Sequence, residues 1–268
     1  MSTPTIRQPV RLRPIALPTE HGGWGLLGAP ILLGLWVAPS VAGGWLSLAA
    51  LGAFLARQPL KLAVGDWRRG RRFARTIWAE RFIVLYGGTA FLSFLAAWFT
   101  AVAPFWPPIV LAAPLAAIQL RYDILKQSRA LAAEMCGAVA ISATVAAMVM
   151  AAGWEFRPAL ALWLLLALQA TTAIVYVGAR LRLARGEAAR AWPAHVAHLL
   201  ALVIVLALVW TGLAPRLSAV VFAALLARSL LGVLPCSLKT PTPLVGMQEL
   251  GFSLLAVAGI ALGLRLGW

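Results

Sequence analysis

Charged residues are scarce in this chain, and acidic residues are the scarcest of them. Only 12% of the 268 residues are charged, and eight Asp and Glu stand against 23 Lys and Arg, with three His. A soluble domain carries roughly a quarter charged residues, whereas 62% of this chain is hydrophobic. A soluble fold could not hide that much apolar surface, so the composition indicates a protein that lies largely in lipid.

Motifs for metal or cofactor chemistry are also missing. The two cysteines, Cys136 and Cys236, have no metal-ligand spacing, so we expect two free thiols. The net charge of +15 would suit a nucleic-acid partner. Its basic residues, however, alternate with apolar stretches instead of forming one soluble face, and we expect no nucleic acid. The first 21 residues lack an apolar core followed by a small-residue cleavage site, so we also expect no cleavable signal.

Apolar stretches of roughly 20 residues, the length that crosses a bilayer, recur nine times. They lie at 22–39, 41–57, 82–102, 104–120, 130–152, 158–179, 192–213, 216–234 and 243–264. We therefore predict an all-α integral membrane protein with nine transmembrane helices. The sequence divides into a basic cytoplasmic tail, 1–21, and a single polytopic domain, 22–268.

The basic residues predict the orientation. Twenty of the 23 lie in the tail and at every second junction between spans, and the other junctions hold only Arg157, Arg216 and Arg265. The positive-inside rule then puts the N-terminus in the cytoplasm and the C-terminus outside the cytoplasmic (inner) membrane. The basic segment 58–81 is too charged to span, and we expect an amphipathic helix over 62–80 that attracts anionic lipid headgroups.

Acidic side chains at membrane depth are costly, so their positions carry information. Glu134 and Glu249 fall one to two turns inside their spans from the cytoplasmic side, and Arg228 lies at a similar depth. Glu20 and His21 precede the first span. This common depth predicts one cytoplasm-facing polar cavity, with the four acid or base candidates Glu20, His21, Glu134 and Glu249. The alternative is ion pairing that only holds helices together, as between Arg228 and Glu249.

Basic and tyrosine side chains recur at a spacing of four residues, which puts them on one helix face. The pairs are Arg57 and Lys61, Tyr122 and Lys126, and Tyr176 and Arg180. Guanidinium groups bind phosphate or carboxylate bidentately and Lys adds a point charge, so with Arg228 these residues predict a site for an anionic head. Positive-inside topology is the alternative for each one. His195 and His198 could chelate a metal, but we expect them at the membrane interface.

Three segments resemble a known family. They are PTEHGGWGLLGAPILLGL (18–35), RYDILKQSRALAAEMCGA (121–138) and PTPLVGMQELGFSLL (241–255). They are similar to the YwiC-like family of bacterial membrane proteins, and the likeness covers nearly the whole chain. That family name implies no settled activity.

A more distant likeness is to the UbiA-type intramembrane prenyltransferases, which have nine helices and a cavity open to the cytoplasm and to lipid. Tyr122 and Lys126 match their Tyr-x-x-x-Lys motif, in which the lysine approaches the diphosphate. Their two Asp-rich motifs, which bind Mg²⁺, are missing. Only Asp66 remains of the first, and Ala173 and Arg180 stand where aspartates of the second would be. A divalent ion needs oxygen ligands, so we expect no Mg²⁺ and no other cofactor.

The sequence therefore predicts a UbiA-like bundle that binds, and as a further option transfers, an isoprenoid or other amphiphile with an anionic head. Arg57, Lys61, Lys126 and Arg180 would hold the head, and the acid or base candidates would orient them. Membrane lipids are the expected partners. Catalysis is left open, and a transporter or accessory membrane protein that uses intramembrane Glu and Arg is the alternative.

Overall fold

The computed structural model describes residues 11–18 and 21–267, and this part of the chain is helical without strands. The α-helices are α1 (Arg13–Ala16), α2 (His21–Val37), α3 (Val41–Trp67), α4 (Ala74–Thr100), α5 (Trp106–Ile124), α6 (Leu131–Ala151), α7 (Phe156–Ala184), α8 (Trp192–Trp210), α9 (Arg216–Leu231) and α10 (Thr242–Leu266), with a 3-10 helix, η1 (Ser237–Lys239). Each of the nine apolar stretches in the sequence coincides with one helix, from α2 to α10.

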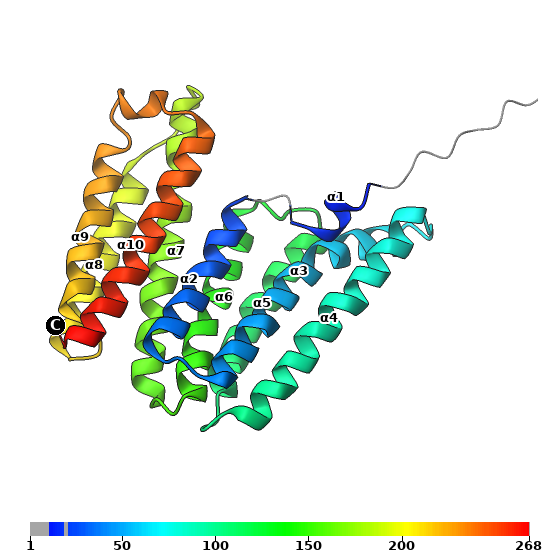
Figure 1. Cartoon of the computed structure of the whole chain (residues 1–268). Coiled ribbons are helices and arrows are strands. Elements are labelled where there is room, and N and C mark those ends of the chain that lie inside the picture. The colour runs from blue at the N-terminus through cyan, green and yellow to red at the C-terminus, as the bar shows by residue number, and fades with distance from the viewer. Residues whose placement is uncertain (1–10, 19–20, 268) are drawn as a thin grey trace, which may run out of the picture.

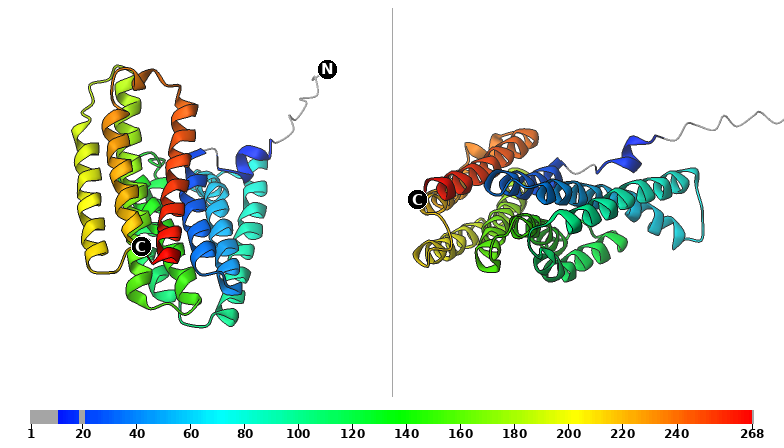
Figure 2. Two further views of the ribbon diagram at one scale, coloured as in Figure 1. Left: turned by 60° about the vertical axis from the view of Figure 1, so that its left-hand side comes forward. Right: turned by 60° about the horizontal axis from the view of Figure 1, so that its bottom comes forward.

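The long helices run alternately up and down, so that successive helices are antiparallel (Figure 1). Helices α2 to α6 lie at one side of the bundle and α7 to α10 at the other. Helix α6 packs on α2, α3, α5 and α7. Helix α10 packs beside α2, so the two sides of the bundle are in contact (Figure 2). The largest cluster of buried apolar residues is centred on α6 and α7.

In the described residues, five helices are long and apolar enough to cross a membrane: α4, α6, α7, α8 and α10. Helix α2 is apolar but shorter. The structure thus has the character of a multi-pass membrane protein in the part of the chain that it describes. Little of α4 is buried, whereas α6 is the most buried of the five. The small residues of α6 allow neighbouring helices to approach closely.

The expected amphipathic helix over 62–80 is wrong. Helix α3 continues to Trp67, a turn follows with Gly70 in the left-handed region at φ +64°, and α4 begins at Ala74. The physical cause is Asp66, which is 2% exposed. Its carboxylate accepts hydrogen bonds from Arg75 Nη2 at 2.6 Å and Thr76 Oγ1 at 2.8 Å. These contacts fasten the start of α4 to the end of α3, so the charged run folds back on itself.

The α3–α4 contact depends on a glycine. A Cβ atom at Gly52 would lie 2.8 Å from the carbonyl oxygen of Tyr86 and 2.9 Å from the backbone nitrogen of Ala90. We expect Gly52→Ala to cost about 1–3 kcal/mol of stability because backbone atoms of α4 would have to move. The midpoint of thermal unfolding in mild detergent measures this. Gly44→Ala, on the same helix with open space around it, is the control, and equal midpoints for the two variants would contradict the prediction.

The Asp66 contact predicts a pH dependence. The hydrogen bond from Arg75 lowers the pKa of Asp66 below its ordinary value of 3.8. A carboxyl whose folded-state pKa is lowered contributes stability above its unfolded pKa and loses it as the pH falls through the folded value. We therefore compare the midpoints of thermal unfolding of the unmodified chain and of Asp66→Asn. The difference between them should be constant from pH 8 to pH 5 and should shrink as the pH falls below 3.8. A difference that grows on acidification would contradict this.

Candidate functional site

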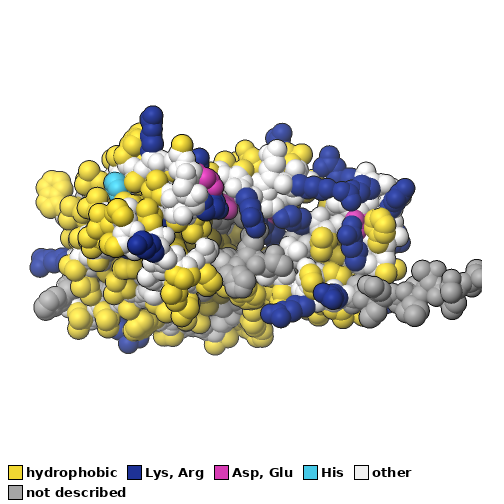
Figure 3. Space-filling model, turned by 90° about the horizontal axis from the view of Figure 1, so that it is seen from above, with side chains coloured by type: hydrophobic (Ala, Val, Ile, Leu, Met, Phe, Trp, Pro, Cys, Tyr) yellow, Lys and Arg dark blue, Asp and Glu magenta, His cyan; other side chains and the backbone are white. Residues whose placement is uncertain are grey.

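Basic side chains gather at the upper end of the bundle, where α3, α5, α7 and α9 end. In a view from above, Lys and Arg spread over this face, and few acidic side chains are visible among them (Figure 3). Two groups of buried polar side chains lie just below it. We call the group on α3 and α5 the first polar group and the group on α7 to α10 the second polar group.

The first polar group is built on an ion pair between Arg57 of α3 and Asp123 of α5. Arg57 Nε lies 2.5 Å from Asp123 Oδ2, and Nη2 donates to Oδ1 at 2.9 Å. The Asp123 side chain is fully buried, whereas that of Arg57 keeps 23% exposure. Such two-point pairing is the strongest that Arg and a carboxylate make. Here it joins α3 to α5 through two residues that are 66 positions apart in the sequence.

Arg57 also contacts Gln119 of α5. The side-chain oxygen of Gln119, in the amide orientation that suits both residues, accepts from Arg57 Nη1 and Nη2 at 3.2 Å. Gln119 fits because α6 has Gly137 opposite it. A Cβ atom there would lie 2.1 Å from the side-chain amide of Gln119. Helices α3, α5 and α6 therefore position this guanidinium together.

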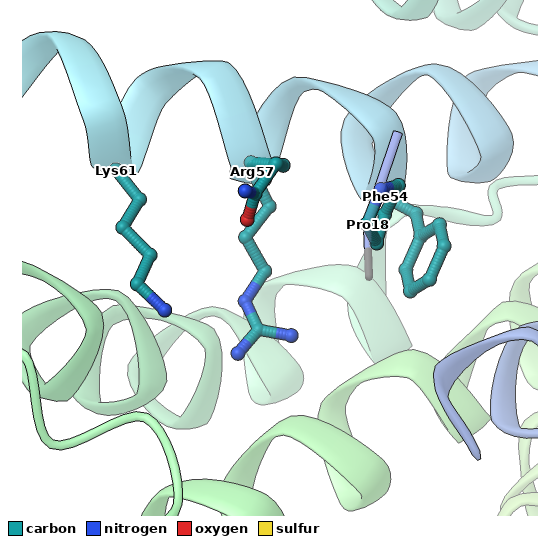
Figure 4. Close-up of a pocket in the computed structure, with 5 residues that line it drawn as sticks. Pro18, Phe54, Arg57 and Lys61 are labelled. Carbon is teal, nitrogen blue, oxygen red and sulfur yellow. The ribbon is translucent and has the colours of Figure 1, made fainter. Parts of the chain in front are cut away.

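Lys61 lies one turn beyond Arg57 on the same face of α3 and donates to the hydroxyl of Ser128. Among the described residues, no carboxylate lies within ion-pair distance of Lys61. A hollow runs along this face, lined by Pro18, Phe54, Arg57, Gln58 and Lys61. The basic groups of Arg57 and Lys61 point the same way from α3, and Phe54 and Pro18 lie toward the other end (Figure 4). The hollow is thus basic at one end and apolar at the other.

Tyr122 and Lys126 do not share a helix face, which corrects the expectation from their spacing. Helix α5 ends at Ile124. Gln127 N donates to the carbonyl of Tyr122 at 2.8 Å and Lys126 N to that of Asp123 at 3.1 Å. This is a Schellman ending, whose left-handed position is usually glycine. Here the residue is Lys126, at φ +61°, and its side chain is exposed.

The second polar group contains the predicted pair of Arg228 and Glu249. Arg228 Nη1 donates to Glu249 Oε2 at 2.5 Å, joining α9 to α10. Arg228 Nη2 lies 3.1 Å from His198 Nε2, and His198 Nδ1 lies 2.8 Å from the carbonyl oxygen of Ala194. A carbonyl only accepts and a guanidinium only donates. His198 must therefore carry its proton on Nδ1 and be neutral.

Tyr176 and Arg180 lie together on α7, as their spacing predicts. Arg180 Nη1 donates to Tyr176 Oη and to Gln248 Oε1, both at 3.1 Å, and Nη2 donates to the carbonyl of Ser237 at 3.0 Å. The guanidinium of Arg228 lies 4.5 Å from the centre of the fully buried Tyr176 ring. A cation over an aromatic face is attracted by the ring, so Tyr176 stabilises the Arg228 side chain.

Other predicted residues lie elsewhere. Glu20 and the side chain of His21 fall outside the described residues, although α2 begins at His21. Glu134 is exposed in the first turn of α6, where a negative charge suits the helix dipole. The contacts assemble the remaining residues in two places, and the single cavity predicted from their common depth stays a prediction.

Sequence reasoning missed four residues of these groups: Gln119, Asp123, Ser128 and His198. Asp123 is one of the eight acidic residues, but nothing in the sequence pairs it with Arg57. His198, expected at the membrane interface, is 2% exposed and belongs to the second polar group. Its spacing from Arg228 gives no local signal. Among the described residues, no cluster of three or more His, Cys, Asp or Glu could hold a metal ion.

Comparison with known proteins bears on the first polar group. Residues 17–149 match the family described as YwiC-like protein. Over this half, the chain belongs to the YwiC-like family. No curated protein and no solved structure gives a significant match.

The YwiC-like match runs from the start of α2 almost to the end of α6. It therefore includes every residue of the first polar group, from Arg57 to Ser128, and also Gly137 of α6 opposite Gln119. The second polar group, from Tyr176 to Glu249, lies beyond the matched residues. The part of the chain with a family resemblance is thus the part that builds the hollow beside Lys61.

Removing the buried carboxylate tests the first polar group. We expect Asp123→Ala to lower stability by about 3–5 kcal/mol, because it removes one member of a buried ion pair that joins α3 to α5. Thermal midpoints in mild detergent measure the change. Glu187→Ala removes an exposed carboxylate paired with Arg182 and Arg185 and should leave the midpoint unchanged. Similar midpoints for both variants would show that the Arg57–Asp123 pair does not hold the helices together.

Proposed function

We propose that this YwiC-like protein binds an amphiphile with an anionic head, with the head at Lys61 and Arg57 and the apolar part along Phe54. An isoprenoid phosphate or diphosphate has this chemistry. The protein would hold the ligand from the cytoplasmic side of a bacterial inner membrane. Transfer of the isoprenoid to an acceptor is a further step of the proposal, and it would proceed without an Asp-bound Mg²⁺.

The observation that carries the proposal is the unequal charge of the hollow. Its lining has a lysine and an arginine at one end and a phenylalanine and a proline at the other. Lys61 contacts a neutral hydroxyl, that of Ser128, where a buried or half-buried ammonium is best served by an anion. Lys126, two residues before Ser128, is held in a backbone conformation that costs a non-glycine residue about 1–2 kcal/mol. Such strain is often found at functional sites.

The proposal includes nine membrane spans in a UbiA-like arrangement, with the N-terminus in the cytoplasm. Supporting it are the nine long helices from α2 to α10 in the described residues, their alternating directions and the basic face at one end (Figures 1 and 3). Basic residues stay on the cytoplasmic side during insertion. The same orientation would place the hollow where a cytoplasmic phosphate or diphosphate head could reach it.

Native mass spectrometry with lipid extraction tests the proposal, using protein purified in mild detergent. The chain has three lysines, Lys61, Lys126 and Lys239, and each is changed to Gln in turn. We expect an anionic amphiphile to be retained by the unmodified chain and reduced at least about tenfold by Lys61→Gln, because one charge-assisted contact of about 1.4 kcal/mol corresponds to that factor.

Lys239→Gln is the matched control, because it removes an exposed lysine of the same face and should leave retention unchanged. Loss in Lys126→Gln as well would support the likeness of Tyr122 and Lys126 to the prenyltransferase motif. Retention of bulk phospholipid alone, equal in all three variants, would overturn the proposal and favour a transporter or accessory protein.

A further inference from the structure

The second polar group has more buried positive charge than negative charge. Arg180 is 4% exposed and Arg228 is 8% exposed, and among the described residues Glu249 is the one carboxylate in contact with either. His198 is neutral by its hydrogen-bond partners. Two guanidinium groups and one carboxylate leave one uncompensated positive charge. A buried charge without a counter-charge is unfavourable, so the group is suited to receive an anion.

Two buried atoms of this group have no hydrogen-bond partner among the described residues. They are Arg228 Nε, a donor, and Glu249 Oε1, an acceptor. A buried donor or acceptor without a partner costs free energy. Arg228 Nε needs an oxygen that accepts, and Glu249 Oε1 needs a group that donates. An oxyanion that still carries a hydroxyl, such as hydrogen phosphate or a phosphomonoester, supplies both.

The segment between α9 and α10 covers the group, and Arg180 donates to the Ser237 carbonyl in η1 of this segment. Arg180 also donates to the Gln248 amide, which lies beyond the segment on α10. Both acceptors are neutral. Gly232 at the end of α9 leaves room for the Tyr176 hydroxyl, which a Cβ atom would overlap at 1.7 Å. A charged acceptor binds a guanidinium more strongly than a neutral one. An entering oxyanion can therefore take Arg180 from Ser237 and Gln248, which opens the segment.

We propose that Arg180, Arg228 and Glu249 form a second binding site, for a hydroxyl-bearing oxyanion of the hydrogen phosphate or phosphomonoester type, covered by residues 232–241. The site shares no residue with the hollow beside Lys61. The same phosphate chemistry is available from free phosphate and from a lipid with a phosphomonoester head.

Calorimetric titration of the full chain in mild detergent tests the site, with inorganic phosphate or sulfate at neutral pH and fixed ionic strength. Sulfate has no hydroxyl at this pH, so phosphate should bind at least about tenfold more tightly. Glu249→Gln should narrow that difference, since the amide can donate to sulfate. Arg180→Gln should weaken phosphate binding at least about tenfold. Arg182→Gln is the matched control, because Arg182 is exposed on the same helix and pairs with Glu187, and it should bind phosphate normally.

A second arm distinguishes the source of the phosphate. If inorganic phosphate does not bind, native mass spectrometry from bilayer discs should show Arg180-dependent retention of phosphatidic acid, a phosphomonoester, over phosphatidylglycerol, a phosphodiester. Absence of both kinds of binding overturns the proposal, as does equal loss in Arg180→Gln and Arg182→Gln.

If Arg180→Gln does not fold, phosphate binding by Gln248→Ala tests the proposal instead. This change removes a competing acceptor at an exposed position, so phosphate should bind at least about twofold more tightly. Unchanged or weaker binding overturns the proposal. Lys61→Gln should not alter phosphate affinity here, so this site and the proposed function can fail separately.

Discussion

Lipid offers no hydrogen bonds, so each charged group that this chain carries inward needs a partner from another helix. With eight acids for 23 bases, each buried carboxylate becomes a tie between helices. Asp123 ties α5 to α3, Asp66 fastens the start of α4 to the end of α3, and Glu249 ties α10 to α9. These ties lie near the upper end of the bundle. The basic end of the molecule is consequently the region where ion pairs join neighbouring helices.

Among the residues that the structure describes, the same imbalance leaves basic groups that form no ion pair with a carboxylate. Lys61 donates a hydrogen bond to a serine hydroxyl, and Arg180 donates to a tyrosine hydroxyl, a side-chain amide and a backbone carbonyl. Neutral oxygens satisfy the geometry of these cations but not their charge. An anion improves on them, because charge-assisted hydrogen bonds are about twice as strong as neutral ones. Both proposed sites follow from this one physical difference, although they differ in lining and in expected ligand.

Both polar groups depend on a glycine that leaves space for a polar side chain. Gly137 leaves the space that Gln119 occupies beside Arg57, and Gly232 leaves the space for the Tyr176 hydroxyl. At the end of α5, by contrast, Lys126 occupies a position with left-handed backbone angles, where a glycine would have no strain. The geometry of the polar groups therefore depends on the glycines that leave space for a neighbouring side chain, as well as on the charged residues.

The positions of the helices and the contacts within one helix could be predicted from the sequence. Apolar stretches of membrane length predicted where α2 to α10 lie, and the spacing of four residues predicted that Tyr176 and Arg180 meet, because both signals depend only on helix geometry. The rule failed for Lys126, where α5 ends first. Three features could not be predicted from the sequence: Arg57 pairs with Asp123, His198 is buried against Arg228, and residues 62–80 fold back. Those outcomes depend on which helices pack together, and contacts between residues far apart in a single sequence leave no periodic pattern in it.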